Sequence, residues 1–253
     1  MIEDGKVQVD VQDGVGTITF FHPKSNSLPG SLLAEMARTV TESGANDQIR
    51  VIVLRSEGEK AFCAGASFDE LVAISDPATG KEFFMGFARL ILAMKKCPKF
   101  IIARLQGKAV GGGVGVTAAA DYALAMNTSS IKLSELALGL GPFVVGPAVE
   151  RKVGNGPFAA LSIDADWRDA AWAERHGLYA SVHDSIEALD EAVDKLAKTL
   201  AASNPEAMAA LKEAFWSGLD HWDHLLEERA VMSGKLVLSE FTTNKLATFG
   251  RKR

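Results

Sequence analysis

The chain has 253 residues, of which 47% are hydrophobic, and it carries a formal net charge of −5. This length and composition suffice for a full core in one domain, or in a domain with an appendage. The acidic balance argues against a general affinity for nucleic acid or anionic membranes, although three basic residues, 251–253, stand at the end. The two cysteines, Cys63 and Cys97, indicate neither a disulfide framework nor a zinc cluster. Residues 1–5 are acidic and no run of about 18 apolar residues occurs, so we expect a soluble, cytoplasmic protein that spans no membrane.

The first half of the chain alternates predicted strands with predicted helices. Strands are predicted at residues 6–11, 15–21, 50–56, 100–105, 122–126 and 130–133, with a hairpin turn at Asp13-Gly14. Helices are predicted at residues 31–41, 67–74 and 81–96, after Gly112, and as a short helix that begins at Ser134-Glu135. Such alternation favours a mostly parallel sheet covered by helices.

Beyond residue 157 the pattern is mainly helical. Helices are predicted at residues 170–176, 186–202, 205–219 and 221–238 and in a last segment that ends near Phe249, and a strand at residues 179–182. The C-terminal helices are too apolar to stand alone in water, so we expect them to pack on the core or on a neighbouring subunit.

Two turns rich in small residues, at 62–67 and 107–115, are the most specific feature of the sequence. Small side chains let a ligand lie directly against backbone N–H groups. Two such groups that converge on one oxygen form an oxyanion hole, which suits chemistry on a thioester or another acyl group. Glycine runs more often serve close packing, so these turns alone do not decide between packing and ligand binding.

With Ser134-Glu135-Leu136 added, the two turns resemble the enoyl-CoA hydratase/isomerase (crotonase) superfamily. The resemblance covers nearly the whole chain. It implies an α/β fold: a crotonase-like spiral of ββα units over residues 1–195, which holds the CoA and acyl site, and a C-terminal helical trimerisation region over residues 196–253. It also implies an acyl-CoA thioester as substrate, a place in fatty acid metabolism, no cofactor beyond the CoA of the substrate, and a homotrimer or hexamer.

The resemblance also assigns site residues. The N–H groups of Ala64 and Gly112 would form the oxyanion hole, and Glu135 would be the catalytic carboxylate. The residues expected to border the CoA or the acyl group are Lys24, Ser25, Ala66, Phe68, Gly111 and Phe143. Family hydratases carry a second glutamate where this chain has Gly115, and a glycine where it has Phe143.

A single carboxylate can carry a proton between C2 and C4 of an enoyl thioester and so move its double bond, once the enolate is stabilised. Adding water is easier with two carboxylates. We therefore predict an enoyl-CoA isomerase with Glu135 as the single acid and base. The alternatives are a hydratase that uses Glu135 and water, with Asp69 or Glu70 replacing the missing acid, and a non-catalytic acyl-CoA-binding protein.

One competing pattern remains. Residues 113–118 match Gly-x-Gly-x-x-Ala, and Glu135 follows about 20 residues later, as in a dinucleotide-binding fingerprint. The glycines do not directly follow the strand predicted at 100–105, which argues against this interpretation. The histidines show no metal-ligand spacing, so no metal site is expected, and Cys63 is interpreted as a packing residue.

Overall fold

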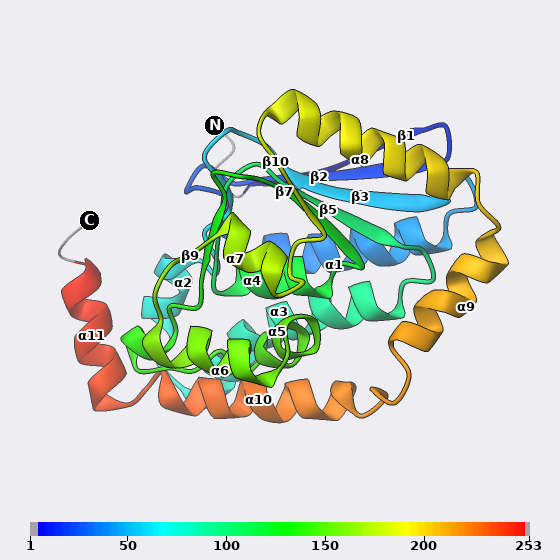
Figure 1. The fold of residues 1–253 in the computed structure, drawn as a ribbon. Coiled ribbons are helices and arrows are strands. Elements are labelled where there is room, and N and C mark those ends of the chain that lie inside the picture. The colour runs from blue at the N-terminus through cyan, green and yellow to red at the C-terminus, as the bar shows by residue number, and fades with distance from the viewer. Residues whose placement is uncertain (1–4, 251–253) are drawn as a thin grey trace.

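The computed structural model describes residues 5–250, except for the side chains of residues 249 and 250 (Figure 1). Most of the acidic N-terminal segment and the three basic residues at the end, which were named above, lie outside the described residues. Among residues 5–250, no helix combines the length and the apolar character that a bilayer crossing requires.

Two sheets form the framework of the described chain. The larger sheet has the order β1 (Lys6–Gln12), β2 (Val15–Phe21), β3 (Val51–Ser56), β5 (Ile101–Leu105), β7 (Tyr122–Met126) and β10 (Ser181–His183). The smaller sheet has the order β4 (Ala61–Cys63), β6 (Lys108–Val110), β8 (Ser130–Lys132) and β9 (Arg168–Asp169). All neighbours pair in parallel except β1 with β2 and β8 with β9.

The two sheets are built by one repeated step. Each of β3, β5 and β7 in the large sheet is followed by β4, β6 or β8 in the small sheet, and then by a helix. The expected spiral of ββα units is thereby confirmed. Because β4, β6 and β8 are parallel neighbours, the segments that follow them meet at one edge of the small sheet.

Helices cover both faces of the large sheet. The helices of the described chain are α1 (Gly30–Ala45), α2 (Phe68–Ala73), α3 (Pro77–Lys96), α4 (Gly112–Ala119), the short 3₁₀ helix η1 (Leu136–Leu138), α5 (Gly146–Val153), α6 (Asn155–Asp164), α7 (Ala170–Arg175), α8 (Ile186–Ala201), α9 (Pro205–Phe215), α10 (Trp222–Leu236) and α11 (Glu240–Gly250). In Figure 1, α8 lies on one face of the large sheet, and α1, α4 and α3 lie on the other. Beyond them, α10 runs along α3.

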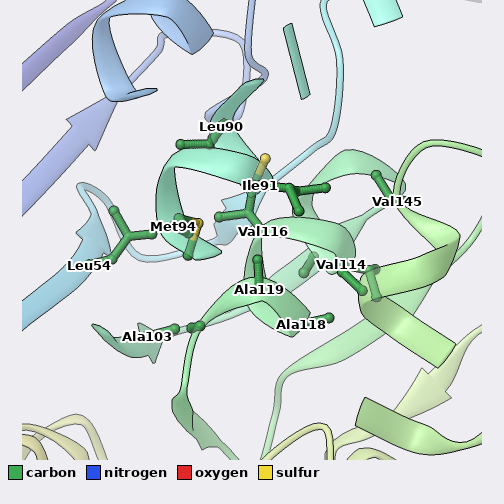
Figure 2. Packing of buried hydrophobic residues seen from close by; sticks show 14 of the residues in the cluster. Leu54, Leu90, Ile91, Met94, Ala103, Val114, Val116, Ala118, Ala119 and Val145 are labelled. Carbon is green, nitrogen blue, oxygen red and sulfur yellow. The ribbon is translucent and has the colours of Figure 1, made fainter. Parts of the chain in front are cut away.

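The main core fills the space between the large sheet and the helices α1, α3 and α4. Figure 2 shows its centre, where Leu54, Ile91 and Met94 pack near Val116 and Ala119 of α4. Every residue of α4 is buried. The start of this helix, which is the second small-residue turn, is therefore held by the core itself.

Most predicted elements are confirmed, and the hairpin turn has Asp13 at φ 51° and Gly14 at φ 82°, both left-handed. Three strands of the small sheet, β4, β6 and β9, were not predicted, because two or three residues are too few for an alternating pattern. Helices α5 and α6 were also not predicted; each has a proline in its first turn, Pro147 and Pro157, a position that proline tolerates.

The C-terminal helices pack on the chain's own core. Trp216, Trp222 and Leu226 belong to the main cluster, and a Cβ on Gly80 of α3 would lie 2.8 Å from the Cα of Gly234 in α10. Residue 195, the expected end of the core region, lies inside α8. A role of these helices in a trimer stays a prediction.

Candidate active site

A cavity of about 310 Å³ lies at the edge of the small sheet where β4, β6 and β8 end. We call it the acyl cavity. Five phenylalanines line it, and they are Phe68, Phe83, Phe84, Phe87 and Phe143. Of the described residues that line it, only Glu135 carries a carboxylic acid. A mainly apolar pocket with one carboxyl group, here accompanied by one basic lining residue, Lys132, is typical of a binding site for a largely apolar ligand.

The first turn follows β4 and presents the N–H of Ala66 to the acyl cavity. Leu28 forms a parallel bridge with Ala66: its N–H donates to the carbonyl of Gly65 at 2.8 Å, and its carbonyl accepts from Ser67 at 3.2 Å. In such a bridge the N–H of the central residue points away from the partner strand. None of the described hydrogen bonds uses the N–H of Ala66, and Ala66 lines the cavity.

The prediction of Ala64 as an oxyanion donor needs correction. The N–H of Ala64 already donates to the carbonyl of Ser25 at 3.2 Å. A backbone donor that is spent on a protein carbonyl is not free to hold a substrate oxygen. The sequence placed both alanines in the right turn, but the alternation of N–H directions along the turn makes Ala66 the available donor.

The second turn follows β6 and ends in the first residue of α4, Gly112. Gly111 has φ 51° and ψ −114°, a conformation open to glycine, and its N–H donates to the carbonyl of Lys132 at 2.8 Å. No described hydrogen bond uses the N–H of Gly112, as expected for the first turn of a helix. The positive end of the helix dipole lies at the same place and favours an anion.

The two turns are in direct contact through Gly65. This residue has φ 90°, and a Cβ on it would lie 2.9 Å from the carbonyl oxygen of Val110 and 3.7 Å from the nitrogen of Gly112. Only glycine permits both the conformation and the approach. Because both turns line the acyl cavity, the free N–H groups of Ala66 and Gly112 are available to the same ligand.

Glu135 follows β8 and lies beside the second turn. Its backbone carbonyl accepts from the N–H groups of Leu138 at 3.0 Å and Leu140 at 2.9 Å, which fixes the loop around η1. A Cβ on Gly111 would lie 3.0 Å from Oε1 of Glu135, so the carboxyl group is packed against this glycine. Oε2 is buried and has no hydrogen-bond partner among the described residues. This burial raises the pKa of Glu135 to about 7.

Val145 and Phe143 form an apolar part of the wall of the acyl cavity. A Cβ on Gly115 would lie 2.5 Å from both Cβ and Cγ1 of Val145, and Val145 lines the acyl cavity. Phe143 also lines it, and its ring packs against Gly141. Val145 therefore fills the space next to Gly115, where the resemblance implied a glutamate, and Phe143 is the bulky residue where it implied a glycine.

The two acids considered as replacements are engaged elsewhere. Oε2 of Glu70 accepts from the N–H of Gly30 at 2.8 Å, at the start of α1. Asp69 forms an ion pair with Lys24. Neither carboxylate lines the acyl cavity, so neither takes the place of an acid at Gly115.

A second groove of about 340 Å³ adjoins the acyl cavity, and we call it the first-loop groove. It is lined by Lys24, Ser25, Ser27, Ala64, Ala66, Phe68 and Asp69, of which Ala64, Ala66 and Phe68 also line the acyl cavity. Four residues expected to border CoA or the acyl group, Lys24, Ser25, Ala66 and Phe68, thus lie together.

The loop between β2 and α1, which we call the first loop, is fixed by a residue that the sequence analysis missed. Asn26 has φ 56°, and its side-chain amide donates to the carbonyls of Glu57 at 2.8 Å and Ala61 at 2.9 Å. Its side-chain oxygen accepts from the N–H of His22 at 3.0 Å. An asparagine in a loop after His-Pro was a signal for a left-handed turn residue.

The competing interpretations find no support in this geometry. Gly113 and Gly115 lie inside α4 and pack on Cys63 and Val145, so they do not form a phosphate-binding turn. Burial raises the pKa of the Cys63 thiol to about 12, which agrees with a packing role. Within residues 5–250, no group of three or more histidine, cysteine, aspartate or glutamate side chains is arranged to hold a metal ion.

Comparison with known proteins points to one family. Residues 10–245 match the family model described as enoyl-CoA hydratase/isomerase. The chain is similar to a probable enoyl-CoA hydratase of Rhizobium meliloti, with 33% identity over 210 residues that cover 81% of this chain and 79% of the relative. It is also similar to the short-chain-enoyl-CoA hydratase of Clostridium acetobutylicum, with 26% identity over 100% of this chain and 97% of the relative.

The fold agrees with this relationship. The crystal structure of a putative enoyl-CoA hydratase from Mycobacterium avium paratuberculosis superimposes with a TM-score of 0.88 at 25% identity, covering 98% of this chain and 97% of that one. An enoyl-CoA hydratase from Bacillus halodurans has a TM-score of 0.89 at 20% identity, which covers 96% and 99% of the two chains and shows the fold alone.

Proposed function

Because this chain belongs to the enoyl-CoA hydratase/isomerase family, whose members act on acyl-CoA thioesters, we propose that it is an enoyl-CoA isomerase. It moves a double bond from the 3,4 to the 2,3 position of the acyl chain. The proposal rests mainly on which carboxyl groups line the acyl cavity. Among the described lining residues, Glu135 alone has a carboxyl group, and its pKa of about 7 suits both the removal and the return of a proton near neutral pH.

The first step needs a stabilised enolate. The thioester oxygen accepts hydrogen bonds from the N–H groups of Ala66 and Gly112. Two preorganised donors of this kind contribute roughly 3 to 4 kcal/mol each in enzymes where one has been removed. The dipole of α4, which begins at Gly112, adds to the field that favours negative charge on this oxygen. No cofactor beyond the CoA of the substrate is required.

The proton then moves within the cavity. The ionised carboxylate of Glu135 removes a proton from C2, and the electrons of the C–H bond pass into a dienolate whose charge lies on the thioester oxygen. The protonated carboxyl group returns the proton to C4, and the double bond forms between C2 and C3. Atoms and electrons balance without a second reactant, and the buried Oε2, which has no described protein partner, is free to exchange the proton.

The wall formed by Val145 and Phe143 favours isomerisation over hydration. Hydration requires a water molecule that is held in place and deprotonated as it attacks C3. It also requires a proton donor for the neighbouring carbon, C2. Val145 fills the space next to Gly115, so no polar side chain reaches the cavity from that position. An apolar wall offers such a water molecule few hydrogen-bond partners.

Hydration by Glu135 and water is the second candidate function, and the names of the relatives favour it. The probable hydratase of Rhizobium meliloti and the short-chain hydratase of Clostridium acetobutylicum are both named for this reaction. A third relative, from Mycobacterium tuberculosis, is named as a hydrolase of a bicyclic indene-carboxyl-CoA, with 29% identity over 80% of this chain and 81% of the relative. Isomerisation and hydration by Glu135 would both use the oxyanion hole to stabilise a thioester enolate.

Product analysis separates the candidates. The protein is incubated in deuterated water with matched 2-enoyl-CoA and 3-enoyl-CoA substrates, and the products are followed by NMR. The proposal predicts migration of the double bond without formation of 3-hydroxyacyl-CoA, and deuterium at C4 then reports how often the carboxyl group exchanges its proton with solvent before returning it. Rapid formation of 3-hydroxyacyl-CoA would make the protein a hydratase. Binding of both substrates with neither double-bond migration nor deuterium exchange would make it a non-catalytic acyl-CoA-binding protein.

A further inference from the structure

We infer that the ring of Phe83 closes the inner side of the acyl cavity and so limits the length of the acyl chain that the protein binds. Removal of the ring would join the cavity to a neighbouring groove, into which a longer chain would extend. This inference rests on the proposed function in one respect, because it takes the cavity to be the acyl site.

Phe83 is shared by two spaces. It lines the acyl cavity, and it also lines a groove of about 680 Å³ between α1, α2 and α3, which we call the α1–α3 groove. The α1–α3 groove shares no lining residue with the first-loop groove. A chain that enters past Ala66 and Phe68 therefore reaches the α1–α3 groove only by passing the ring of Phe83.

The ring is held in place by its neighbours. Phe83 and Phe84 make an edge-to-face contact with centroids 5.0 Å apart and planes at 88°. Both rings pack on a cluster that includes Leu71 of α2 and Leu140. Because the Phe83 ring packs against both Phe84 and this cluster, it keeps a fixed position rather than moving freely between rotamers.

The α1–α3 groove has the chemistry of an alkyl-chain site. Small and aliphatic residues line much of it, namely Gly30, Ala34, Ala73, Ile74, Ala78 and Gly86. Its charged residues are already paired: Glu70 accepts from the N–H of Gly30, and Glu82 forms an ion pair with Arg89. An alkyl chain that fills this groove would leave no charge without a partner.

Binding of saturated acyl-CoA thioesters, from butanoyl-CoA to hexadecanoyl-CoA, tests the inference by calorimetry. In the wild-type protein the affinity should stop rising once the chain reaches Phe83. In Phe83→Ala the affinity, expressed relative to that for butanoyl-CoA, should continue to rise, by up to about fourfold for each added methylene group. Phe83→Leu, which removes less volume and keeps the core apolar, should shift the limit in the same direction if Phe83→Ala does not fold.

Two control variants separate opening of the wall from simple enlargement. Leu138 lines the acyl cavity and not the groove, so Leu138→Ala should leave the chain-length limit nearly unchanged. Ala73 lines the groove and not the cavity, so Ala73→Trp added to Phe83→Ala should restore the wild-type limit.

The inference is overturned by an unchanged length profile in Phe83→Ala, by an equal gain in Leu138→Ala, or by a gain that survives Ala73→Trp. Saturated thioesters cannot isomerise or take up water. The length profile therefore stands or falls independently of the reaction that the protein catalyses.

Discussion

Gly115 and Val145 pack so closely that a single added methyl group does not fit between them: a Cβ on Gly115 would lie 2.5 Å from both Cβ and Cγ1 of Val145. Gly115 is fully inside the buried helix α4, and Val145 is part of both the core and the wall of the acyl cavity. Residue 115 therefore carries no acid, and the apolar side chain of Val145 fills the space that a side chain at residue 115 would need.

This contact predicts a specific coupling between the two positions. Gly115→Ala should lower the free energy of unfolding by about 1–3 kcal/mol, because the new methyl group overpacks the core. Val145→Gly, which removes both Cβ and Cγ1, should remove most of that penalty when the two changes are combined. Urea unfolding of the two single variants and the double variant gives the interaction energy. Strictly additive effects would show that the two side chains do not compete for one space.

The raised pKa of Glu135 predicts a pH-dependent stability. Folding favours the protonated form of this carboxyl group. The stability that the raised pKa contributes to the free energy of unfolding is therefore fully present below the ordinary pKa of 4.5, and it is lost as pH rises through about 7. Above that pH, the wild-type protein should have lost about 3 kcal/mol relative to Glu135→Gln, which has no charge to bury. Denaturant unfolding of both proteins from about pH 5 to about pH 8 measures this difference. A difference that stays constant with pH would contradict the burial of an ionisable carboxyl group.

The same ionisation should control the rate. The base must be ionised to remove a proton from C2, so kcat/KM for a 3-enoyl-CoA should rise with pH and level off above a pKa near 7 in the free enzyme. A profile that is flat down to pH values near the ordinary 4.5 would be incompatible with this environment of Glu135.

The correction from Ala64 to Ala66 is open to a direct chemical test. Replacement of Ala66 by lactic acid in a semisynthetic protein removes the N–H and keeps the side chain. We expect kcat to fall by roughly 10²- to 10³-fold, as for other single oxyanion donors. The same replacement at Ala64 removes the bond to the carbonyl of Ser25, and it should affect stability more than kcat. The reverse pattern would restore Ala64 as the donor.

A buried ion pair joins α9 to the core. The ammonium group of Lys212 lies 2.8 Å from Oδ2 of Asp121, the same oxygen accepts from the N–H of Ile101 at 2.8 Å, and both charged side chains are almost fully buried. Asp121→Asn should lower the free energy of unfolding by about 3–5 kcal/mol, because it leaves a buried ammonium group uncompensated.

An exposed ion pair is the matched control for Asp121→Asn. Asp194 pairs with Lys198 on the surface of α8, and Asp194→Asn should cost less than about 1 kcal/mol. Lys212→Met combined with Asp121→Asn should recover part of the loss. Equal effects at the buried and exposed pairs would contradict the burial.

The sequence predicted what depends on local patterns. The Asp13-Gly14 hairpin, the long helices and the two glycine turns are encoded within a few neighbouring residues, and the structure confirms them. The position of Glu135 beside Gly111 follows from the parallel pairing of β6 and β8, which the local sequence pattern does not contain.

The features that could not be predicted from the sequence depend on contacts between residues far apart along the chain. The direction of one N–H in the first turn is set by the bridge between Leu28 and Ala66, about 40 residues apart along the chain. The filling of the space beside Gly115 by Val145 and the commitment of Glu70 to the N–H of Gly30 are likewise tertiary. None of these contacts has a periodic signature in the chain.

The most direct test of the central claim is the fate of a 3-enoyl-CoA with the wild-type protein and with Glu135→Gln, which keeps the shape of the side chain and removes the base. The account predicts that the wild-type protein forms the 2-enoyl-CoA without 3-hydroxyacyl-CoA. It also predicts that Glu135→Gln forms neither product while it still binds a saturated acyl-CoA with nearly wild-type affinity. Continued double-bond migration in Glu135→Gln, or 3-hydroxyacyl-CoA as the main wild-type product, would contradict it.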